Sequence, residues 1–288
     1  MKGLMMNFNI RMSMKTKFLI FFLFVSSTCF SQGWWFASPV ATGGTGPWAS
    51  YSTLVSGLPD IGSWSNPAIV KIGTDYYLVS GEYSNNQFNG YKWNGSSWAA
   101  NSTIVSGFAD AGSGPSPAFV EISSNLYCVW GKSDGTFSGY IWNGSGWTSN
   151  STITSGLNSP GGQVQPSFVN IGSTLYSLIF DWNSGSYAGS VWNGSGWDSN
   201  STITSGMSRS SYYPKGTSLT IGTDVFYIKI GSAGVQGYKW NGSGWDSNST
   251  IISGLSGSAY NTPYFINFNS NYCLIVGNSN GTFTGFKY

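Results

Sequence analysis

The segment Trp-Asn-Gly-Ser-Xaa-Trp occurs four times in this chain, and its spacing limits the possible folds more than any other feature. The copies begin at Trp93, Trp142, Trp192 and Trp240, at intervals of 49, 50 and 48 residues. Asn-Gly is a strong hairpin signal, because both residues tolerate the positive φ of a tight turn. A repeat of this length that contains hairpins is typical of the blades of a β-propeller.

Incomplete copies of the repeat at both ends indicate that the units close into a ring. Trp48 opens a segment that matches the one beginning at Trp98. The chain ends with Gly285-Phe-Lys-Tyr288, which matches Gly90-Tyr-Lys-Trp93. Because the first unit lacks its front and the last lacks its back, the two ends complete one unit. We therefore predict a ring closed by the N-terminal strand Trp48–Val55. A linear solenoid is the alternative, but it would need polar capping repeats, and none is visible.

Each unit contains four short segments rich in β-branched and aromatic residues, separated by Gly, Ser and Asn. In the second unit these segments are Pro117–Ile122, Leu126–Trp130, Ser138–Trp142 and Trp147–Ile153. The fold class predicted from this pattern is all-β. Its architecture is a five-bladed β-propeller with four antiparallel strands per blade, and the N-terminal strand closes the last blade.

The N-terminal residues predict export from the cytoplasm. Lys15 and Lys17 precede the apolar run Phe18–Val25, and small residues follow it, as in a secretory signal. The run is shorter than the roughly 20 residues that a membrane span needs. We predict a signal peptide over residues 1–31, an extension over 32–47 and the propeller over 48–288. The mature protein would be extracellular, periplasmic or on the cell surface.

Composition excludes several classes of function. Without residues 1–31 the chain has 8 basic and 10 acidic residues and no basic cluster, which argues against nucleic-acid binding. The absence of histidine excludes a Ser-His-Asp triad and His-ligated metals. We predict no metal and no cofactor, and we expect a monomer.

Cys128 and Cys273 fall in the same strand of units that are not neighbours, so we expect free thiols.

The loops that vary between repeats predict the binding face. The repeated turns join strands three and four or strands one and two, so in a propeller they share one face. The other face carries loops that diverge, as binding loops on a rigid scaffold do. Their aromatic, amide and few charged side chains suit carbohydrate, which stacks on rings and hydrogen-bonds through hydroxyls. The predicted ligand-binding residues are Asn66, Trp64, Glu82, Tyr83, Trp130, Lys132, Gln165, Asp181, Trp182, Tyr213, Lys215 and Tyr260.

Five residues that precede the first strands should ring the mouth of the central channel: Asn66, Ser116, Gln165, Lys215 and Thr262. The segment Asn66–Ser80, followed by Gly90-Tyr and Trp98, resembles a blade of the family 43-type five-bladed glycosidases. In that family an Asp-Pro opens a strand and the Asp is the catalytic base. The equivalent slots here hold no carboxylate, and glycoside hydrolysis normally needs two carboxyl groups about 5–10 Å apart.

The regular aromatic repeat over Trp48–Tyr288 is more similar to the propeller lectins of the tachylectin-2 type. The first hypothesis is therefore a secreted, non-catalytic, lectin-like protein whose partners are glycans or glycoconjugates. A glycoside hydrolase stays open as an alternative, with Glu82 and Asp181 as the catalytic pair and Asp60 or Asp110 as a third member. A protein-binding or adhesive scaffold is a further alternative.

Overall fold

The structure is a computed structural model, and it describes residues 48–61, 64, 66–83, 86–109, 114–158, 164–181, 184–208, 214–258 and 260–288. The predicted signal peptide and the extension over residues 32–47 lie outside the described residues and stay predictions. Within the described part of the chain, no helix is long and apolar enough to cross a membrane.

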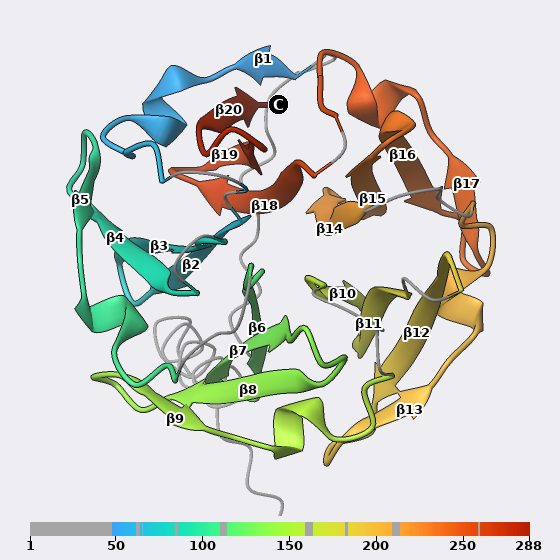
Figure 1. Cartoon of the computed structure of the whole chain (residues 1–288). Helices are drawn as coiled ribbons and strands as arrows, with labels where there is room; N and C mark the ends of the chain where they lie inside the picture. Colours follow the sequence, from blue (N-terminus) through green and yellow to red (C-terminus); the bar gives the residue numbers. More distant parts are fainter. Residues whose placement is uncertain are drawn as a thin grey trace, which may run out of the picture. The chain divides into compact units, whose positions relative to one another are not determined.

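Five four-stranded antiparallel sheets surround a central axis (Figure 1). Blade 1 contains β2 (Asn66–Ile72), β3 (Asp75–Gly81), β4 (Phe88–Trp93) and β5 (Trp98–Ala100). Blade 2 contains β6 (Ala118–Ile122), β7 (Asn125–Gly131), β8 (Phe137–Trp142) and β9 (Trp147–Ser149). Blade 3 contains β10 (Ser167–Ile171), β11 (Thr174–Asp181), β12 (Ser186–Trp192) and β13 (Trp197–Ser199). Blade 4 contains β14 (Lys215–Ile221), β15 (Asp224–Gly231), β16 (Gly234–Trp240) and β17 (Trp245–Ser247).

Blade 5 joins the two ends of the propeller. It contains β18 (Thr262–Phe268), β19 (Asn271–Gly277) and β20 (Phe283–Lys287), and its outer strand is β1 (Ala49–Ser50). Ala49 pairs with Lys287 and Ser50 with Phe286. The inner strands contact one another in the order β2, β6, β10, β14 and β18, and β18 contacts β2 again. The predicted five-bladed ring and its closure by the N-terminal strand are confirmed.

The outer strands are shorter than predicted. The expected strand Trp147–Ile153 ends at Ser149, and a 3₁₀ turn, η3 (Thr152–Thr154), follows. The side-chain oxygen of Asn150 accepts the backbone N–H of Ile153 at 3.1 Å, which satisfies a donor of the turn and ends the extended conformation. The same turn recurs as η1 (Ser52–Val55), η2 (Thr103–Val105), η4 (Thr202–Thr204) and η5 (Thr250–Ile252).

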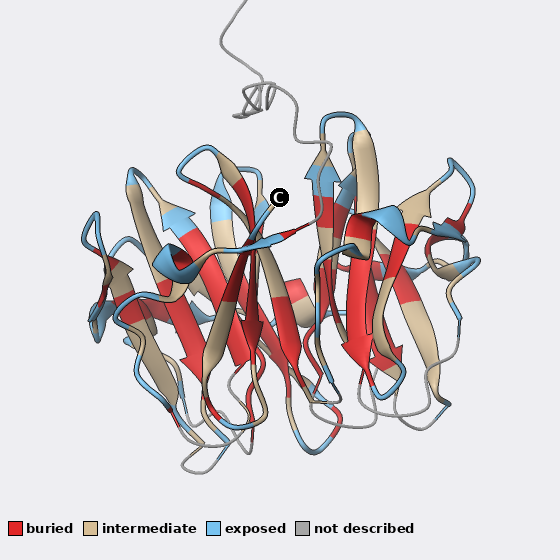
Figure 2. Cartoon of the chain, turned by 90° about the horizontal axis from the view of Figure 1, so that it is seen from above, coloured by how far each residue is buried: buried red, intermediate tan, exposed pale blue. Residues whose placement is uncertain are grey.

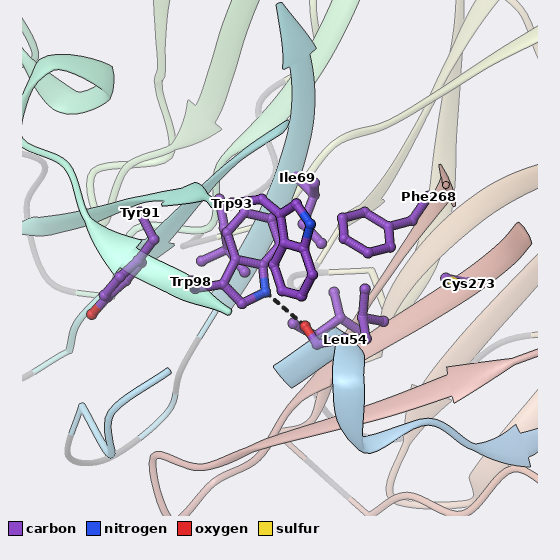
Figure 3. Close-up of a cluster of buried hydrophobic side chains, with 9 residues drawn as sticks. Leu54, Ile69, Tyr91, Trp93, Trp98, Phe268 and Cys273 are labelled. Carbon is purple, nitrogen blue, oxygen red and sulfur yellow. Dashed lines mark hydrogen bonds between the residues drawn. The ribbon is translucent and has the colours of Figure 1, made fainter. Parts of the chain in front are cut away.

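The second Trp of each repeat joins its blade to the preceding one. The indole of Trp98 donates to the carbonyl of Leu54 at 2.7 Å, across the junction of blades 5 and 1 (Figure 3). The indoles of Trp147, Trp197, Trp245 and Trp48 make the equivalent bonds to the carbonyls of Ile104, Ile153, Ile203 and Ile251. Each of these five Trp residues is buried. The second Trp of the repeated motif therefore has a structural role, which is to link neighbouring blades.

The core lies between neighbouring blades, where the middles of the strands are buried (Figure 2). One cluster joins Leu54 and Phe268 of blade 5 to Ile69 and Trp98 of blade 1. Cys128 and Cys273 are both buried free thiols, as predicted.

Strand register places the loops on the two faces as the sequence predicts. Asn66 at the start of β2 is paired with Gly81 at the end of β3, and Gly81 with Phe88 at the start of β4. The divergent loops before β2 and between β3 and β4 therefore share one face. We call this the loop face. The Trp93–Trp98 turn, where the first and last residues are paired, lies at the opposite ends of the strands.

Candidate functional site

Three predicted site residues meet at the junction of blades 5 and 1 on the loop face. Trp64 precedes β2, Tyr83 follows β3, and Tyr260 precedes β18. The rings of Trp64 and Tyr260 are stacked, with centroids 5.1 Å apart and planes only 4° apart. The ring of Tyr83 lies against Trp64 at 4.4 Å and is 37% exposed. We call these three residues the aromatic platform.

The backbone of the platform is held in an unfavourable conformation. Trp64 has φ = 59° and Tyr260 has φ = 73°, a region that bulky residues rarely adopt. Trp64 stands two positions before Asn66, and Tyr260 stands two positions before Thr262. Asn66 and Thr262 are both predicted to line the mouth of the channel. Gly114 occupies the same position in blade 2 with φ = 64°, where glycine carries no steric cost. In the three blades where this position is described, its backbone is left-handed, and blades 1 and 5 have an aromatic residue where blade 2 has glycine. Strain of this kind clusters at functional sites.

The backbone of the neighbouring loop holds the platform in position. The N–H of Trp64 donates to the carbonyl of Ser279 at 3.2 Å, and the N–H of Ile61 donates to Gly281 at 3.3 Å. Both acceptors belong to the loop between β19 and β20 of blade 5. The platform thus combines side chains from three loops on a backbone that is tied across the blade junction.

Four of the five predicted ring residues are joined by hydrogen bonds. The Lys215 ammonium donates to the side-chain oxygen of Asn66 and, at 2.9 Å, to the Ser116 hydroxyl. The Thr262 hydroxyl donates to the same oxygen of Asn66 at 2.7 Å. These contacts join blades 1, 2, 4 and 5 across the axis. The fifth member, Gln165, donates from its amide to the carbonyl of Pro117 at 2.8 Å. We call these five residues the channel ring.

Lys215 carries the only charge in the channel ring. Asn66, Ser116, Gln165 and Thr262 are buried, whereas Lys215 is partly exposed. Burial of the Lys215 amine away from water lowers its pKa from the ordinary 10.5 to about 7. Among the residues that the structure describes, ion pairs form between Lys92 and Asp75, Lys132 and Asp134, and Lys239 and Asp224. Lys215 belongs to none of these pairs.

A cavity of about 120 Å³ extends into the channel between the inner strands. Gln165, Ser167, Thr217, Ser218 and Tyr264 contribute polar groups to its wall. The side-chain oxygen of Gln165 is buried and lacks a hydrogen-bond partner within the described structure. The Tyr264 hydroxyl bonds to the backbone of Phe119, and burial raises the pKa of Tyr264. Tyr264 therefore crosses the channel from blade 5 to blade 2, a role that its position two residues after Thr262 did not reveal.

The two carboxylates of the hydrolase alternative stand in blades that are not neighbours. Glu82 follows β3 of blade 1, and its side chain accepts a hydrogen bond from the Asn89 amide at 3.1 Å. Asp181 ends β11 of blade 3, where its backbone carbonyl accepts the N–H of Gly185 at 2.9 Å. Asp60 lies in the loop before β2, and Asp110 lies outside the described residues.

The prediction that Trp130 contacts the ligand is wrong. It is fully buried on β7 and packs at 4.8 to 5.1 Å from the rings of Phe88, Phe108 and Tyr140. Such a side chain presents no face to a ligand. Lys132 lies on the loop face after β7 and pairs with Asp134 at 3.6 Å. Trp182 and Tyr213 lie outside the described residues, and their roles stay predictions.

The described residues contain no group of three or more carboxylate, thiol or imidazole side chains that could hold a metal ion. The donors near the channel are amides, hydroxyls and one ammonium, which suit hydrogen bonding to polar ligands. The geometry therefore joins an aromatic stacking surface to a polar ring with a single positive charge.

Comparisons with known proteins relate the chain to other five-bladed propellers through structure alone. No family model matches the sequence, and no curated protein matches it. An exo-β-1,3-galactanase from Phanerochaete chrysosporium, solved with β-1,3-galactotriose, is similar with a TM-score of 0.54 and 10% identity. The match covers 84% of this chain but only 63% of the galactanase chain.

Two further solved structures resemble the chain. A family 43 β-xylosidase/α-arabinofuranosidase from a compost metagenome, in complex with xylotriose, has a TM-score of 0.54 and 7% identity. That match covers 83% of this chain and 93% of the other. The SapL1 lectin, in complex with α-methyl fucoside, has a TM-score of 0.49 and 14% identity, with coverage of 78% and 81%. At these identities the likeness to the family 43 enzymes shows the fold, which is the five-bladed β-propeller.

Proposed function

We propose that the protein binds glycans through the aromatic platform and does not hydrolyse them. The observation that carries this proposal is the meeting of Trp64, Tyr83 and Tyr260 from three separate loops. Aromatic faces stack on the C–H faces of sugar rings, and neighbouring amides and hydroxyls bind the sugar hydroxyls. The strained backbone at Trp64 and Tyr260 supports a role in binding, because glycine would satisfy the fold at lower cost.

The composition of the channel ring supports binding without catalysis. A glycosidase places two carboxyl groups on either side of the scissile bond. The five ring residues are Asn66, Ser116, Gln165, Lys215 and Thr262, none of which can act as an acid or base carboxyl group. The similar galactanase and xylosidase are solved with oligosaccharides, which supports a carbohydrate ligand for a propeller of this kind.

A glycan array with the purified protein tests this function. Wild-type protein should bind a defined set of glycans, and Trp64→Ala should lose binding to all of them. Lys92→Ala is the control, because Lys92 pairs with Asp75 at the ends of the strands opposite the loop face. If Trp64→Ala binds as the wild type does, the platform is not the binding site. If no glycan binds, the protein-binding scaffold becomes the better hypothesis.

Glycoside hydrolysis is the second candidate, because most of the similar solved structures are family 43 enzymes. In this case Glu82 and Asp181 would act as the carboxyl pair. Bound oligosaccharides should be followed for new reducing ends over several hours. Hydrolysis that Glu82→Gln abolishes would establish an enzyme and overturn the non-catalytic proposal.

We also propose that the protein is exported and that residues 1–31 are removed. The basic residues, apolar run and small residues at the N-terminus support this proposal. The mature protein should be recovered outside the cytoplasm, and mass spectrometry should find Gln32 as its first residue. Recovery of full-length protein in the cytoplasm would contradict export.

A further inference from the structure

We propose that the glycan carries an anionic substituent, a carboxylate or a sulfate ester, which binds to Lys215 while a sugar ring stacks on the aromatic platform. This inference rests on the proposed function and specifies the class of ligand. The inference is based on the short chain connection between the platform residues and the channel-ring residues.

Chain connectivity places the platform beside the channel ring. Trp64 stands two residues before Asn66, and Tyr260 stands two residues before Thr262. Two residues span at most about 7 Å of backbone. Asn66 and Thr262 are hydrogen-bonded to each other at 2.7 Å, and Asn66 also accepts from Lys215. The residues of the stacked ring pair and the Lys215 ammonium are therefore attached to the same small polar cluster.

The charge on Lys215 lacks compensation among its described partners. Its partners, Asn66 and Ser116, are neutral, and it donates two of its three N–H groups to them. A desolvated ammonium without a counter-charge is costly, since burial removes hydration that neutral acceptors replace only in part. The lowered pKa of Lys215, for which burial is the cause, reflects this cost. An anionic ligand would supply the missing charge and stabilise the protonated amine.

The Lys215 side chain is partly exposed, but its ammonium is buried against Asn66 and Ser116, so an anion has to enter the channel ring to contact it. The other four channel-ring residues are buried, and Lys215 alone is partly exposed. Lys215 gives the channel ring its single positive charge. A positive charge in the channel ring attracts the anionic group of a sugar. It leaves the hydroxyl contacts that a neutral sugar makes unchanged.

Matched pairs of oligosaccharides test the inference by isothermal titration calorimetry. The first pair is trigalacturonate and its carboxyl-reduced counterpart, which has the same linkages without charge. The second pair is a sulfated galactan trisaccharide and its desulfated form. Wild-type protein should bind the anionic member of at least one pair tenfold or more tightly than the neutral member. The pair that shows this preference identifies the anion as carboxylate or sulfate.

Two variants assign the preference to a residue. Lys215→Gln keeps a donor near Asn66 but removes the charge, so the preference should fall to about onefold. Lys92→Gln removes a charge at the opposite ends of the strands, where Lys92 pairs with Asp75, and should leave the preference unchanged. Equal affinity of wild-type protein for charged and neutral members overturns the inference, and so does a preference that Lys215→Gln retains. Far-ultraviolet circular dichroism and the melting temperature check that each variant is folded.

Failure of the inference and failure of the proposed function give different results. If neutral oligosaccharides bind as tightly as anionic ones and Trp64→Ala abolishes both, glycan binding stands and the anion preference is wrong. If none of the four oligosaccharides binds, both are wrong for these ligands. Sodium sulfate and sodium acetate are then tested alone by thermal shift. Stabilisation of wild-type protein that Lys215→Gln lacks would show an anion site without a glycan.

Discussion

At the scale of single residues, the platform shows a conflict between stability and function. The position two residues before the channel ring adopts positive φ in blades 1, 2 and 5. Blade 2 places Gly114 there, while blades 1 and 5 place Trp64 and Tyr260. An L-residue in the left-handed region costs about 1–2 kcal/mol relative to glycine. The chain accepts this cost at two of the three described positions, which is expected where a side chain has a function.

This conflict predicts a separation of stability from binding at position 64. Trp64→Gly and Trp64→Ala both remove the ring and should both lose glycan binding. Trp64→Gly should nevertheless be the more stable of the two by about 1 kcal/mol, because alanine retains the strain. Urea denaturation measures the difference, and Tyr260→Gly with Tyr260→Ala provides an independent pair. Equal stability of the two variants at both positions would show that the backbone there is not strained.

A second prediction at the residue scale concerns pH. Burial lowers the pKa of Lys215 to about 7, and burial also lowers the pKa of Lys229. Between pH 7 and about 8 the unfolded chain then binds more protons than the folded chain, so the free energy of unfolding rises with pH. At higher pH the raised pKa values of the buried thiols Cys128 and Cys273, and then of Tyr227 and Tyr264, act in the opposite direction, because only the unfolded side chains lose their protons.

Urea denaturation at pH 7, 7.5 and 8 measures this dependence. The free energy of unfolding should rise over the series for wild-type protein. Lys215→Met removes one of the two groups and should show a shallower rise. A flat profile for the wild type, or an identical slope in Lys215→Met, would mean that the Lys215 amine is better solvated than its surroundings indicate.

At the scale of elements, the turns η2 to η5 each depend on one asparagine side chain, whereas η1 follows Tyr51 and has no side-chain cap. Asn150 bonds to the N–H of Ile153, and Ile153 is fully buried between blades. Asn150→Ala should reduce the free energy of unfolding by about 1 kcal/mol, the usual cost of losing such a cap. Ser151→Ala is the control, because Ser151 makes no side-chain capping bond. A loss of equal size in both variants would argue against a specific cap.

These turns also show what the sequence could and could not predict about the elements. The hairpins were predictable because Asn-Gly at Asn143 has a local conformational preference. The end of the fourth strand was not, because Ile153 and its neighbours favour a strand locally while the Asn150 side chain competes for the backbone. The burial of Trp130 was missed for another reason. Residues 128–131 of β7 are buried on both faces between blades, so they show no alternation to distinguish inward from outward side chains.

The candidate site could be predicted only in part for a similar reason. The register of the repeat identified the channel ring, since Asn66 and Lys215 occupy equivalent positions. The platform depends on three loops without a common pattern, so its residues were predicted individually and their stacking was not. Tyr264 was missed because its position in β18 looks like that of any inner-strand residue, and only the assembled ring brings Phe119 within its reach.

At the scale of the whole molecule, closure of the ring depends on the N-terminal segment. Trp48 and Leu54 are buried, β1 pairs with β20, and the Leu54 carbonyl accepts the indole N–H of Trp98. A chain that begins at Gly57 lacks all of these contacts and leaves the edge of blade 5 unpaired. It should lose several kcal/mol of stability, since each large buried side chain contributes about 1.5–3 kcal/mol.

The matched chain for this prediction begins at Trp48 and keeps the closing strand. It should unfold in one cooperative transition, whereas the chain beginning at Gly57 should unfold at lower urea concentration and aggregate through its exposed strand edge. Equal midpoints for the two chains would show that the ring remains stable without its closing strand.

The central claim is that the aromatic platform binds glycans and that the protein does not cleave them. The most direct test is calorimetric titration of one array-positive oligosaccharide into wild-type protein and Trp64→Ala, followed by an assay of the same samples for new reducing ends. We predict at least a tenfold loss of affinity in Trp64→Ala, equivalent to about 1.4 kcal/mol, and no new reducing ends with either protein. Unchanged affinity in Trp64→Ala, or reducing ends that accumulate with wild-type protein and not with Glu82→Gln, would contradict the claim.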